Sequence, residues 1–580
     1  MNLSVQSQGE SLKPVSLSIS QSRITTQVNN TGTWRFVRPK YQEKTAPCSI
    51  ACPLGVDIAL VEMMAARKDL KKAHDTLLME NPFPAICGRV CFHPCENACN
   101  RKHLDKPVAV HHIERFIGDW GLKNNLRPEH LYPEQNNSKI AIIGAGPAGL
   151  AVAYFGHRLG YSCDIFDKSD GPGGLLDYGI PSYRLPKDIL KHELRRLEND
   201  GINMVFNQSI FPEKLDALKQ NYDAIFLCCG DAKSIQLKIP GENNTIDGLN
   251  LLHQIHKKTH PALKGDIAVI GGGNTAVDVA RSLVRLGTRP IIVYRRTQNE
   301  MPAHPHEINA ALAEGVILKE CLSPMFIESD TNKQNLSLQV MKAHGQTRDG
   351  RQAFIPDGDR KETLTVDHVI TAIGAEPELM WHLQPDQWDM KISHCRMQMN
   401  EIPYFWCGDL ATSEKTVTHA LASGKQAILA LDILRNHSQG DIPKILKECQ
   451  VGDGESISFE MYIQGKRLKR SSEKVSNDFI NAAYFFPISE ISPKNIPIDD
   501  CRKSFDEVIQ TFEDSQAIKA AERCFNCGIC NDCDTCRIFC PEMAIQWENG
   551  DRHILMDYCK GCGICIVECP RNAMTLEVEP

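Results

Sequence analysis

The feature that most limits the fold of this chain is a glycine-rich turn that directly follows a run of apolar residues. Residues 140–150 read IAIIGAGPAGL, with Gly144, Gly146 and Gly149 in the spacing G-x-G-x-x-G. A strand that passes through such a turn into a helix brings the helix N-terminus close to a pyrophosphate. The strand expected next ends at Asp167, where a carboxylate can accept hydrogen bonds from a ribose. The stretch predicts a doubly wound α/β domain that binds a dinucleotide.

A second unit of the same kind follows later in the chain, where the sequence reads IAVIGGGNTAVDVA. Gly271 and Gly273 match the pattern, and Ala276 replaces the third glycine, which the fingerprint allows. The strand expected next is followed by Arg295 and Arg296. Paired guanidinium groups suit the 2′-phosphate of NADP, whereas a carboxylate would favour NAD. A solvated basic turn is the alternative interpretation, so we expect NADP or NAD, with NADP favoured.

Two dinucleotide units in one chain predict a flavin that exchanges hydride with a nicotinamide bound opposite it. Between the units, residues 171–186 read GPGGLLDYGIPSYRLP, and Gly173 and Gly174 permit close approach of the backbone to a flat ring. A surface turn is the alternative. Further contacts to a phosphate or flavin oxygen are expected from residues just ahead of a later helix: Gly408, Asp409, Thr416 and Val417.

A disulfide reductase would also use two nucleotide domains, but it needs a C-x-x-C pair beside the flavin. Cys228 and Cys229 are adjacent, and Cys163 lies within a strand pattern. These three cysteines are therefore expected to be packing residues, and electrons must leave the flavin by another route.

Cysteines near the C-terminus form two copies of the run C-x2-C-x2-C-x3-C-P. In such a run three thiolates bind one [4Fe-4S] cluster and the fourth reaches a neighbouring cluster, whereas zinc sites use separated C-x2-C pairs. We expect two clusters on eight ligands: Cys530, Cys533, Cys536, Cys540, Cys559, Cys562, Cys565 and Cys569. Cys524 and Cys527 extend the first run and are either alternative ligands or unused.

Six further cysteines stand near the N-terminus in a less regular pattern: Cys48, Cys52, Cys87, Cys91, Cys95 and Cys99. One [4Fe-4S] cluster needs four thiolates, so six fill one site and leave two. Zinc is an alternative here. Nearby histidines are expected to be structural or exposed: His93, His103, His111 and His112.

Composition limits the class of protein but names no partner. The chain has 580 residues, of which 42% are hydrophobic and 24% charged, with a formal net charge of -7, so no cationic surface for nucleic acid is expected. No apolar run is long enough to span a membrane, and the N-terminus lacks the pattern of a secretory signal. These features predict a cytoplasmic protein.

The expected fold is α/β, with two Rossmann-like nucleotide-binding domains, the nicotinamide domain being inserted in the FAD domain. An N-terminal helical iron-sulfur domain and a C-terminal ferredoxin-like α+β module complete it. The expected divisions are an N-terminal arm over 1–40, the helical iron-sulfur domain over 41–122, the FAD domain over 138–235 and 376–440, the NAD(P) domain over 236–375, a linker over 441–523 and the two-cluster module over 524–580.

The order of several motifs resembles that in the small subunit of glutamate synthase and its relatives, including the reductase half of dihydropyrimidine dehydrogenase. The resemblance covers nearly everything after residue 40. It rests on CGRVC with CENAC, IIGAGPAGL, GGLLDYGIP, GGGNTAVD, YRRT with EMPA, TAIG, and CGD with TVTHALASG. The family implies an FAD domain interrupted by an NADPH domain, with electrons passing from NADPH through FAD to iron-sulfur clusters.

The resemblance also implies site residues. For FAD they are Gly144, Gly146, Pro147, Ala148, Gly149, Asp167, Gly174, Leu175, Gly408, Asp409, Thr416 and Val417. For the nicotinamide nucleotide they are Gly273, Asn274, Thr275, Arg295 and Arg296. One N-terminal cluster is implied on Cys52, Cys91, Cys95 and Cys99, which leaves Cys48 as the remnant of a second cluster whose usual upstream C-x2-C is absent. Cys87 could partly compensate.

The function implied is that of an NAD(P)H:acceptor oxidoreductase that exchanges electrons with a protein redox partner. No side chain is expected to act as a catalytic acid or nucleophile, since the cofactors carry the chemistry. The C-terminal module is similar to that of the iron-sulfur flavoprotein that works with dissimilatory sulfite reductase. A glutamate synthase small subunit and a non-catalytic electron-transfer scaffold are the alternatives, and a homodimer is a further expectation.

Overall fold

The chain forms mixed α and β structure in two compact units. The computed structural model describes residues 30–128, 138–231, 233–330, 333–346, 352–381, 383–548 and 551–579. Unit 1 comprises Met1–Tyr41, Asp532–Pro570 and Met574–Pro580, and unit 2 comprises Gln42–Asn531 and Arg571–Ala573. No helix among the described residues is long and apolar enough to cross a membrane.

Unit 2 begins with a group of helices, some of which carry cysteines. They are α1 (Pro47–Ala51), α2 (Ile58–Ala66), α3 (Leu70–Glu80), α4 (Pro84–Val90), α5 (Pro94–Asn97) and α6 (Val110–Lys123). The cysteines lie in α1, α4 and α5. Proline occupies the first turn of α1, α4 and α5, where its missing N–H is not needed. A Cβ atom at Gly88 would lie 2.4 Å from the backbone nitrogen of Arg115, so glycine allows α4 and α6 to pack closely.

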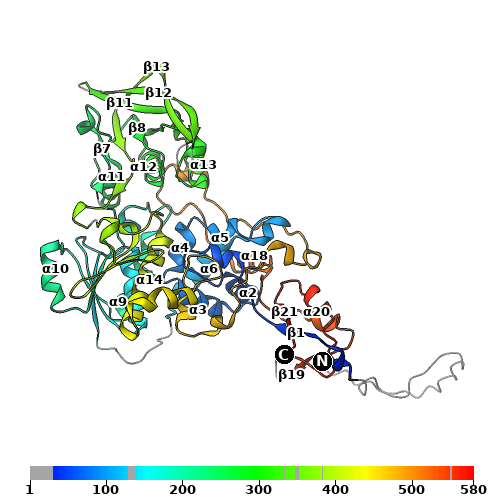
Figure 1. Cartoon of the computed structure of the whole chain (residues 1–580). Helices are drawn as coiled ribbons and strands as arrows, with labels where there is room; N and C mark the ends of the chain where they lie inside the picture. Colours follow the sequence, from blue (N-terminus) through cyan, green and yellow to red (C-terminus); the bar gives the residue numbers. More distant parts are fainter. Residues whose placement is uncertain are drawn as a thin grey trace, which may run out of the picture. The chain divides into compact units, whose positions relative to one another are not determined.

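The first large sheet of unit 2 has seven strands in the order β16-β17-β18-β5-β2-β3-β4. The strands are β2 (Lys139–Ile143), β3 (Ser162–Phe166), β4 (Asn203–Val205), β5 (Ala224–Leu227), β16 (Met390–Lys391), β17 (Arg396–Met399) and β18 (Pro403–Trp406). The associated helices are α7 (Pro147–Arg158), α8 (Leu175–Tyr178), α9 (Lys187–Asn199), α10 (Pro212–Lys219) and α14 (Val417–Asn436) (Figure 1). A Cβ atom at Gly424 would lie 2.3 Å from the Ala148 carbonyl oxygen, so α14 crosses α7 at close range.

A second sheet of five strands, in the order β10-β9-β8-β14-β7, is built from residues between the two parts of the first. Its strands are β7 (Ile246–Asp247), β8 (Asp266–Ile270), β9 (Arg289–Val293), β10 (Ile317–Lys319) and β14 (His368–Thr371). Its helices are α11 (Gly248–Lys257), α12 (Asn274–Arg285) and α13 (Pro305–Ala313). β6 (Lys233–Ser234) pairs with β15 (Ala375–Glu376) where the chain passes between the two sheets.

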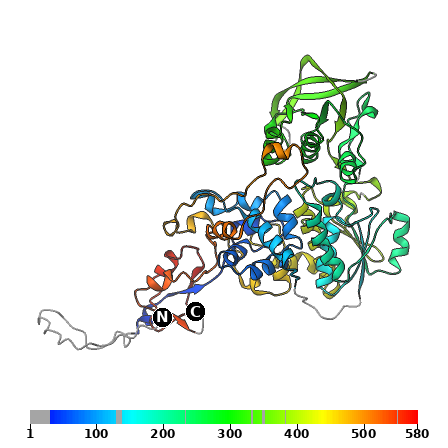
Figure 2. The same cartoon turned by 180° about the vertical axis from the view of Figure 1, so that it is seen from behind.

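Three long antiparallel strands extend from the region of the second sheet (Figures 1 and 2). They are β11 (Leu322–Ser329), β12 (Gln334–Gln346) and β13 (Gln352–Val366). The buried residues Leu336 and Leu338 of β12 belong to one core with Ala268 and Ile270 of β8. This core attaches the start of β12 to the second sheet, whereas the later residues of β12 are largely exposed.

Residues 441–523, expected as a linker, contribute to the main core of unit 2. They form α15 (Ile442–Glu448), α16 (Phe459–Tyr462), α17 (Ile498–Cys501) and α18 (Asp514–Glu522). Phe459, Val475 and Phe512 are buried in the same hydrophobic core as the cysteine-bearing helices. The prolines and charges that suggested a linker lie between these buried anchors.

Unit 1 contains the ferredoxin-like segment and also part of the expected N-terminal arm. β1 (Val37–Tyr41) pairs antiparallel with β21 (Met574–Val578), and β19 (Ile545–Glu548) pairs with β20 (Asp551–Ile554). Two short helices complete it, α19 (Thr535–Ile538) and α20 (Ile564–Val567). Arg35 donates to Glu579 at 2.8 Å. Residues 30–41 are therefore part of the module rather than an arm, and the rest of the expected arm lies outside the described residues.

Candidate functional site

A cavity of about 370 Å³ is lined by residues from both glycine turns of unit 2. Its lining contains most of the residues predicted for the two nucleotides: Gly144, Gly146, Pro147, Ala148, Asp167, Gly174, Leu175, Gly408, Asp409, Thr416, Val417, Asn274 and Thr275. The structure therefore brings the turn before α7, the turn before α12 and the start of α14 to one hollow.

The first glycine turn has the geometry that a bound pyrophosphate needs. Gly144 has φ +111°, and a Cβ atom there would lie 2.4 Å from the Cys228 carbonyl oxygen. A Cβ atom at Gly149 would lie 2.0 Å from the Gly144 oxygen, whereas one at Gly146 would meet nothing within 4 Å. Gly149 thus serves the packing of α7 on its turn and does not line the cavity, and Gly146 leaves space for a ligand. These residues fit the FAD that the sequence predicts.

Two carboxylates lie in the wall of this cavity in different environments. Asp167 accepts hydrogen bonds from the backbone N–H groups of Ala145, at 2.6 Å, and Ser169, at 2.7 Å. Burial and the neighbouring Asp231 raise the pKa of Asp409 to about 6, against the opposing effect of Lys415. Asp167 is held by the turn itself, while Asp409 titrates in a range close to neutral pH.

The second turn repeats the geometry of the first at the start of α12. A Cβ atom at Gly271 would lie 2.2 Å from the Ala372 oxygen, and one at Gly273 would meet nothing within 4 Å. Arg295 is exposed and Arg296 half-buried, and neither lines the cavity. Neither side chain forms an ion pair with any residue in the described ranges. Their guanidinium groups are therefore available to an anion at the end of β9.

An ion pair that the sequence did not reveal also reaches the cavity. Arg184 lies 2.8 Å from Asp278 of α12 and 3.0 Å from Glu307 of α13, and both Arg184 and Asp278 line the cavity. The two carboxylates hold the pKa of Arg184 above its ordinary value despite burial. Arg184 thus ties the loop before α9 to the second sheet's helices. Its only sequence signal is an arginine among prolines and aromatic residues.

A second cavity of unit 2 is lined by cysteines of the short helices. Cys52, Cys87, Cys91 and Cys95 line it, together with Glu62 and Glu114. Burial raises the pKa of Cys91 to about 12 and that of Glu114 to about 7.

The fourth ligand implied for this site, Cys99, stays a prediction. It is not among the residues that line the cavity, and it belongs to the same hydrophobic core as Cys48. The resemblance implies a single site for the four cysteines, and α5 carries Cys95 and ends two residues before Cys99. Further side chains with ligand atoms line the cavity: Glu62, Cys87, His93 and Glu114. Cys87 and Glu114 both hydrogen-bond Asn81, at 3.4 and 2.7 Å.

The donor spacing around this cavity fits an iron-sulfur cluster better than zinc. Tetrahedral zinc with bonds of 2.3 Å would hold its sulfurs about 3.8 Å apart. Among the described residues, no three cysteine sulfurs lie within 4.8 Å of one another. Both carboxylate oxygens of Glu62 are buried without a hydrogen-bond partner. A [4Fe-4S] cluster binds its cysteine sulfurs on four separate irons and so holds them farther apart than one zinc ion does, which agrees with the 4.8 Å limit.

The two cavities share a wall at the first turn of α14. Thr416 and Val417 line the large cavity, and Thr418 lines the cysteine cavity. The Sγ atom of Cys91 lies 3.9 Å from Thr418 Oγ1. The neighbours of Cys91, Val90 and Phe92, also line the large cavity. In both segments, adjacent residues therefore line different cavities: Val417 and Thr418 in α14, and Cys91 between Val90 and Phe92.

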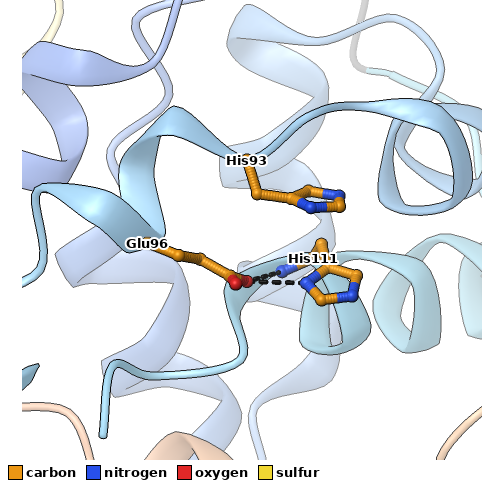
Figure 3. Close-up of side chains that lie close together, drawn as sticks. All are labelled: His93, Glu96 and His111. Atoms are coloured by element: carbon orange, nitrogen blue, oxygen red, sulfur yellow. Dashed lines mark hydrogen bonds and ion pairs between the residues drawn. The ribbon is translucent and has the colours of Figure 1, made fainter. Parts of the chain in front are cut away.

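Three side chains at the cysteine cavity, His93, Glu96 and His111, lie close together (Figure 3). Glu96 accepts from the backbone N–H of His111 at 3.1 Å and contacts its Nδ1 at 2.6 Å. The rings of His93 and His111 stack with centroids 3.8 Å apart. One ligand atom from each of the three side chains lies within 4.8 Å of the others. The contact between Glu96 and His111 joins α5 to α6, and the structural role expected for the histidines stays a prediction.

In unit 1, a small cavity is lined by cysteines of both C-terminal runs. Cys540 of the first run lies there with Cys559, Cys562 and Cys565 of the second. The charges of Cys533 and Cys569 add to burial in raising the pKa of Cys536. This exchange of the fourth cysteine is the arrangement of two-cluster ferredoxins. Cys530 is counted with unit 2, and its assignment stays a prediction.

Comparison with family models assigns three parts of the chain. Residues 138–424 match the pyridine nucleotide-disulphide oxidoreductase model. Residues 40–126 match dihydropyrimidine dehydrogenase domain II, 4Fe-4S cluster, and residues 553–575 match the 4Fe-4S binding domain. The three matches coincide with the large cavity, the N-terminal cysteines and the last cysteine run.

Several curated proteins are similar over most of the chain. The NADP(+)-dependent formate dehydrogenase subunit beta of Moorella thermoacetica is 30% identical over 83% of this chain and 70% of its own length. The NADPH-Fe(3+) oxidoreductase subunit beta of Geobacter sulfurreducens is 28% identical over 83% and 75%. The NAD-dependent dihydropyrimidine dehydrogenase subunit PreT of Escherichia coli is 28% identical over 67% and 90%.

Proposed function

The chain belongs to the family of iron-sulfur flavoprotein oxidoreductases that use FAD, a nicotinamide nucleotide and [4Fe-4S] clusters, and we propose that it exchanges electrons between NADPH or NADH and a protein redox partner. The flavin, when bound, supplies the change from a hydride pair to single electrons. The residues of the chain bind and orient the cofactors and keep water away. No side chain is assigned a role as acid, base or nucleophile.

The observation that carries this proposal is the shared wall between the two cavities of unit 2. Thr416 and Val417 face the large cavity, while Thr418 contacts Cys91 in the other. A group held by the glycine turns is thus separated from a group held by the cysteines by a single turn of α14. Such proximity has no use in a disulfide reductase, but it is what transfer of single electrons requires.

Of the two nucleotides, NADPH is favoured over NADH. Arg295 and Arg296 follow β9, the position at which an acidic residue would select the free ribose hydroxyls of NAD. Their side chains have no carboxylate partner among the described residues. The 2′-phosphate of NADP would supply an anionic partner for the two guanidinium groups.

The proposed partner is a protein subunit that receives or delivers electrons. The similar proteins are named as subunits of a formate dehydrogenase, of an Fe(3+) oxidoreductase and of a dihydropyrimidine dehydrogenase. The motif resemblance suggests dissimilatory sulfite reductase as the partner of this chain. Assembly as a homodimer is the accompanying proposal.

The proposal can be tested by separating flavin reduction from electron exit. We would purify the wild type and a Cys91→Ser variant anaerobically, and follow flavin bleaching by NADPH and steady-state reduction of methyl viologen. We expect bleaching in both proteins, and a fall of viologen reduction by a factor of about 100 in the variant, since losing one ligand disrupts the cluster. A Cys395→Ser variant, changed at a buried cysteine outside both cavities, is the control.

Two results would contradict the proposal. The first is a wild-type flavin that neither nucleotide bleaches. The second is full viologen reduction by the Cys91→Ser variant. Mixing the protein with purified dissimilatory sulfite reductase then tests the finer assignment, because NADPH should reduce the sulfite reductase only when the flavoprotein is present.

A further inference from the structure

Four cysteines of unit 2 remain outside the sites described above. Cys48 and Cys99 come from the N-terminal helices, and Cys524 and Cys527 follow α18 far along the chain. Neither Cys99 nor Cys48 lines the first cysteine cavity. Cys524 and Cys527 precede the ferredoxin-like run but are counted with unit 2.

The segment that carries Cys524 and Cys527 is fixed against the N-terminal helices by hydrogen bonds. Asn526 donates to the Ala59 carbonyl oxygen of α2 at 3.2 Å. Asn100, the neighbour of Cys99, donates to the Sγ atom of Cys527 at 3.4 Å. The Gly528 oxygen accepts from the backbone N–H of Lys44 at 2.9 Å. The segment is therefore held on one side by residues near Cys48 and on another by the residue after Cys99.

Glycine at position 528 is required by this close approach. Gly528 has φ +78°, and a Cβ atom there would lie 2.4 Å from the Lys44 carbonyl oxygen. Any other residue would push the segment away from the strand end that leads to Cys48. The turn after Cys527 is thus built for contact with the N-terminal part of the chain.

A buried charged group fastens the same two segments next to the cysteines. Arg523 lies 2.9 Å from Asp105, and Arg101 donates to the Arg523 carbonyl oxygen at 2.9 Å. Arg101 also pairs with Asp105 at 2.5 Å. The exposed fractions of Arg101 and Arg523 are only 2% and 1%. Arg523 immediately precedes Cys524, so the group positions that cysteine relative to the helix after Cys99.

The four thiols share a buried setting. Cys48, Cys99 and Cys527 belong to one hydrophobic core, and Cys524 packs against it. Cys48, Cys99 and Cys527 are buried, and Cys524 is partly buried. No disulfide joins these four cysteines within the described part of the chain. Four reduced thiols brought together in a core can supply four thiolate ligands, because each thiol loses its proton when it binds a metal group.

Backbone donors already point at the sulfurs of this group. The N–H of Asn526 donates to Cys524 Sγ at 3.3 Å. Hydrogen bonds from backbone N–H groups to cysteine sulfurs stabilise thiolate ligands and tune cluster potentials. The wide spacing of the sulfurs argues against zinc here as in the first cavity, since no three lie within 4.8 Å among the described residues.

We propose that Cys48, Cys99, Cys524 and Cys527 bind a [4Fe-4S] cluster, with two ligands from the N-terminal helices and two from the segment after α18. Cys524 and Cys527 would take the place of the upstream C-x2-C pair, whose absence left Cys48 without a role. Each thiol loses its proton when it binds iron. The chain would then carry four clusters. One is bound by N-terminal cysteines alone, one is bound by Cys48, Cys99, Cys524 and Cys527, and two are bound by the C-terminal runs.

The pairing of cysteines along the helices supports two adjacent clusters. Cys48 and Cys52 are four residues apart, and the Cys52 N–H donates to the Cys48 oxygen at 3.1 Å. Cys95 and Cys99 have the same spacing across α5. Cys52 and Cys95 line the first cavity. Their pair partners, Cys48 and Cys99, belong to the new site. The two clusters would therefore be neighbours linked through two short stretches of backbone.

The test is an iron count on full-length protein. We would purify the wild type, a Cys524→Ser/Cys527→Ser variant and a Cys395→Ser/Cys501→Ser control anaerobically, and reconstitute each with iron and sulfide. Both control cysteines are buried and lie outside all the proposed sites. We expect about 16 iron atoms per chain in the wild type and control, and about 12 in the first variant, since each cluster holds four. Flavin content reports whether each protein is folded.

An unchanged iron content in the folded Cys524→Ser/Cys527→Ser variant would overturn the assignment. If that variant fails to fold, the wild-type protein is measured instead. About 12 iron atoms per fully reconstituted chain, and a Mössbauer spectrum that accounts for only three clusters, would also overturn the assignment. Neither result depends on electron transfer. Wild-type flavin that NADPH bleaches in a protein with 12 iron atoms would leave the proposed function intact while removing this site.

Discussion

The large cavity and the cysteine sites of unit 2 are assembled in opposite ways. In the cavity, each nucleotide turn is a single stretch of chain, as at Gly144–Gly149, where strand, turn and helix follow one another. The cysteine sites draw their ligands from separate helices, and one of them also draws on Cys524 and Cys527 after α18. The first kind of site depends on local backbone geometry, and the second depends on the packing of distant segments.

This difference decides what a single substitution can destroy. A change in a glycine turn should remove one cofactor and leave the packing of the chain intact. A change in the contacts that hold α18 against the N-terminal helices should affect stability and iron content together. The following predictions separate the two cases, beginning with the largest effect.

Replacing Arg523 by methionine should have the largest effect. The substitution removes a buried guanidinium that pairs with Asp105 and leaves the carboxylate short of a partner. Breaking a buried ion pair by removing one partner costs about 3–5 kcal/mol. We expect a lower unfolding temperature and a loss of about four iron atoms per chain. Thermal unfolding and iron analysis measure both quantities.

The matched control is Arg537→Met, which removes an arginine whose pair with Asp534 is partly exposed. Such a pair contributes at most about 1 kcal/mol. Equal destabilisation by the two substitutions would show that the segment after α18 is not fastened by the buried group.

Gly149→Val should empty the flavin site without removing iron. A Cβ atom at this position would lie 2.0 Å from the Gly144 oxygen, so α7 must move away from its turn. Overpacking of this kind costs about 1–3 kcal/mol, and we expect flavin affinity to fall by a factor of up to about 100. Equilibrium dialysis of FAD measures the affinity. Ala276→Gly, at the equivalent position of the second turn, should leave flavin binding unchanged.

If Gly149→Val also lost several iron atoms, the contrast between local and distant assembly would fail. The glycine turn would then be part of the framework that holds the cysteines. Retention of FAD by the variant would instead show that α7 can shift without disturbing the site.

Asp409 should make the stability of the flavin-free protein depend on pH. Burial beside Asp231 raises its pKa to about 6, so folding favours the protonated form. That advantage is complete below about pH 4 and is lost as the pH rises through 6. Compared with Asp409→Asn, the wild type should be equally stable at pH 4 and less stable at pH 7 by about 3 kcal/mol. Unfolding temperatures of both proteins across this range provide the test, and a constant difference would contradict it.

The smallest expected effect concerns Arg295 and Arg296. Replacing both by alanine removes the charges proposed to bind a 2′-phosphate, and one charge-assisted hydrogen bond contributes about 1.5–3 kcal/mol. We expect KM for NADPH to rise by a factor of about 10 or more and KM for NADH to stay the same. Steady-state kinetics with both nucleotides measures the change. An equal rise for the two would assign the arginines to general charge attraction.

The local sites could be predicted from sequence, and the distant ones could not. The strand, turn and helix at β2 to α7 and at β8 to α12 are each encoded by adjacent residues, and the lining of the large cavity contains most of the residues predicted there. That Cys95 lines the cysteine cavity and Cys99 does not could not be predicted, because it depends on how the helices pack. Spacing alone treats the two cysteines as equivalent.

The same reason explains two contacts that the expected division of the chain leaves out. Residues 441–523 are charged and rich in proline, yet Phe459 and Phe512 are buried against helices formed by much earlier residues. β1 has no alternating apolar pattern, but it pairs with β21 at the other end of the sequence. Neither long-range contact leaves a periodic signal in the segment that makes it.

The most direct test of the account is an anaerobic titration of the purified protein with NADPH, followed by flavin absorbance and by EPR spectroscopy, with iron and zinc counted in the same sample. The account predicts that the flavin bleaches and that signals of reduced [4Fe-4S] clusters then appear, in a protein with about 16 iron atoms per chain. Bound zinc in place of iron, or a flavin that neither NADPH nor NADH reduces, would contradict it.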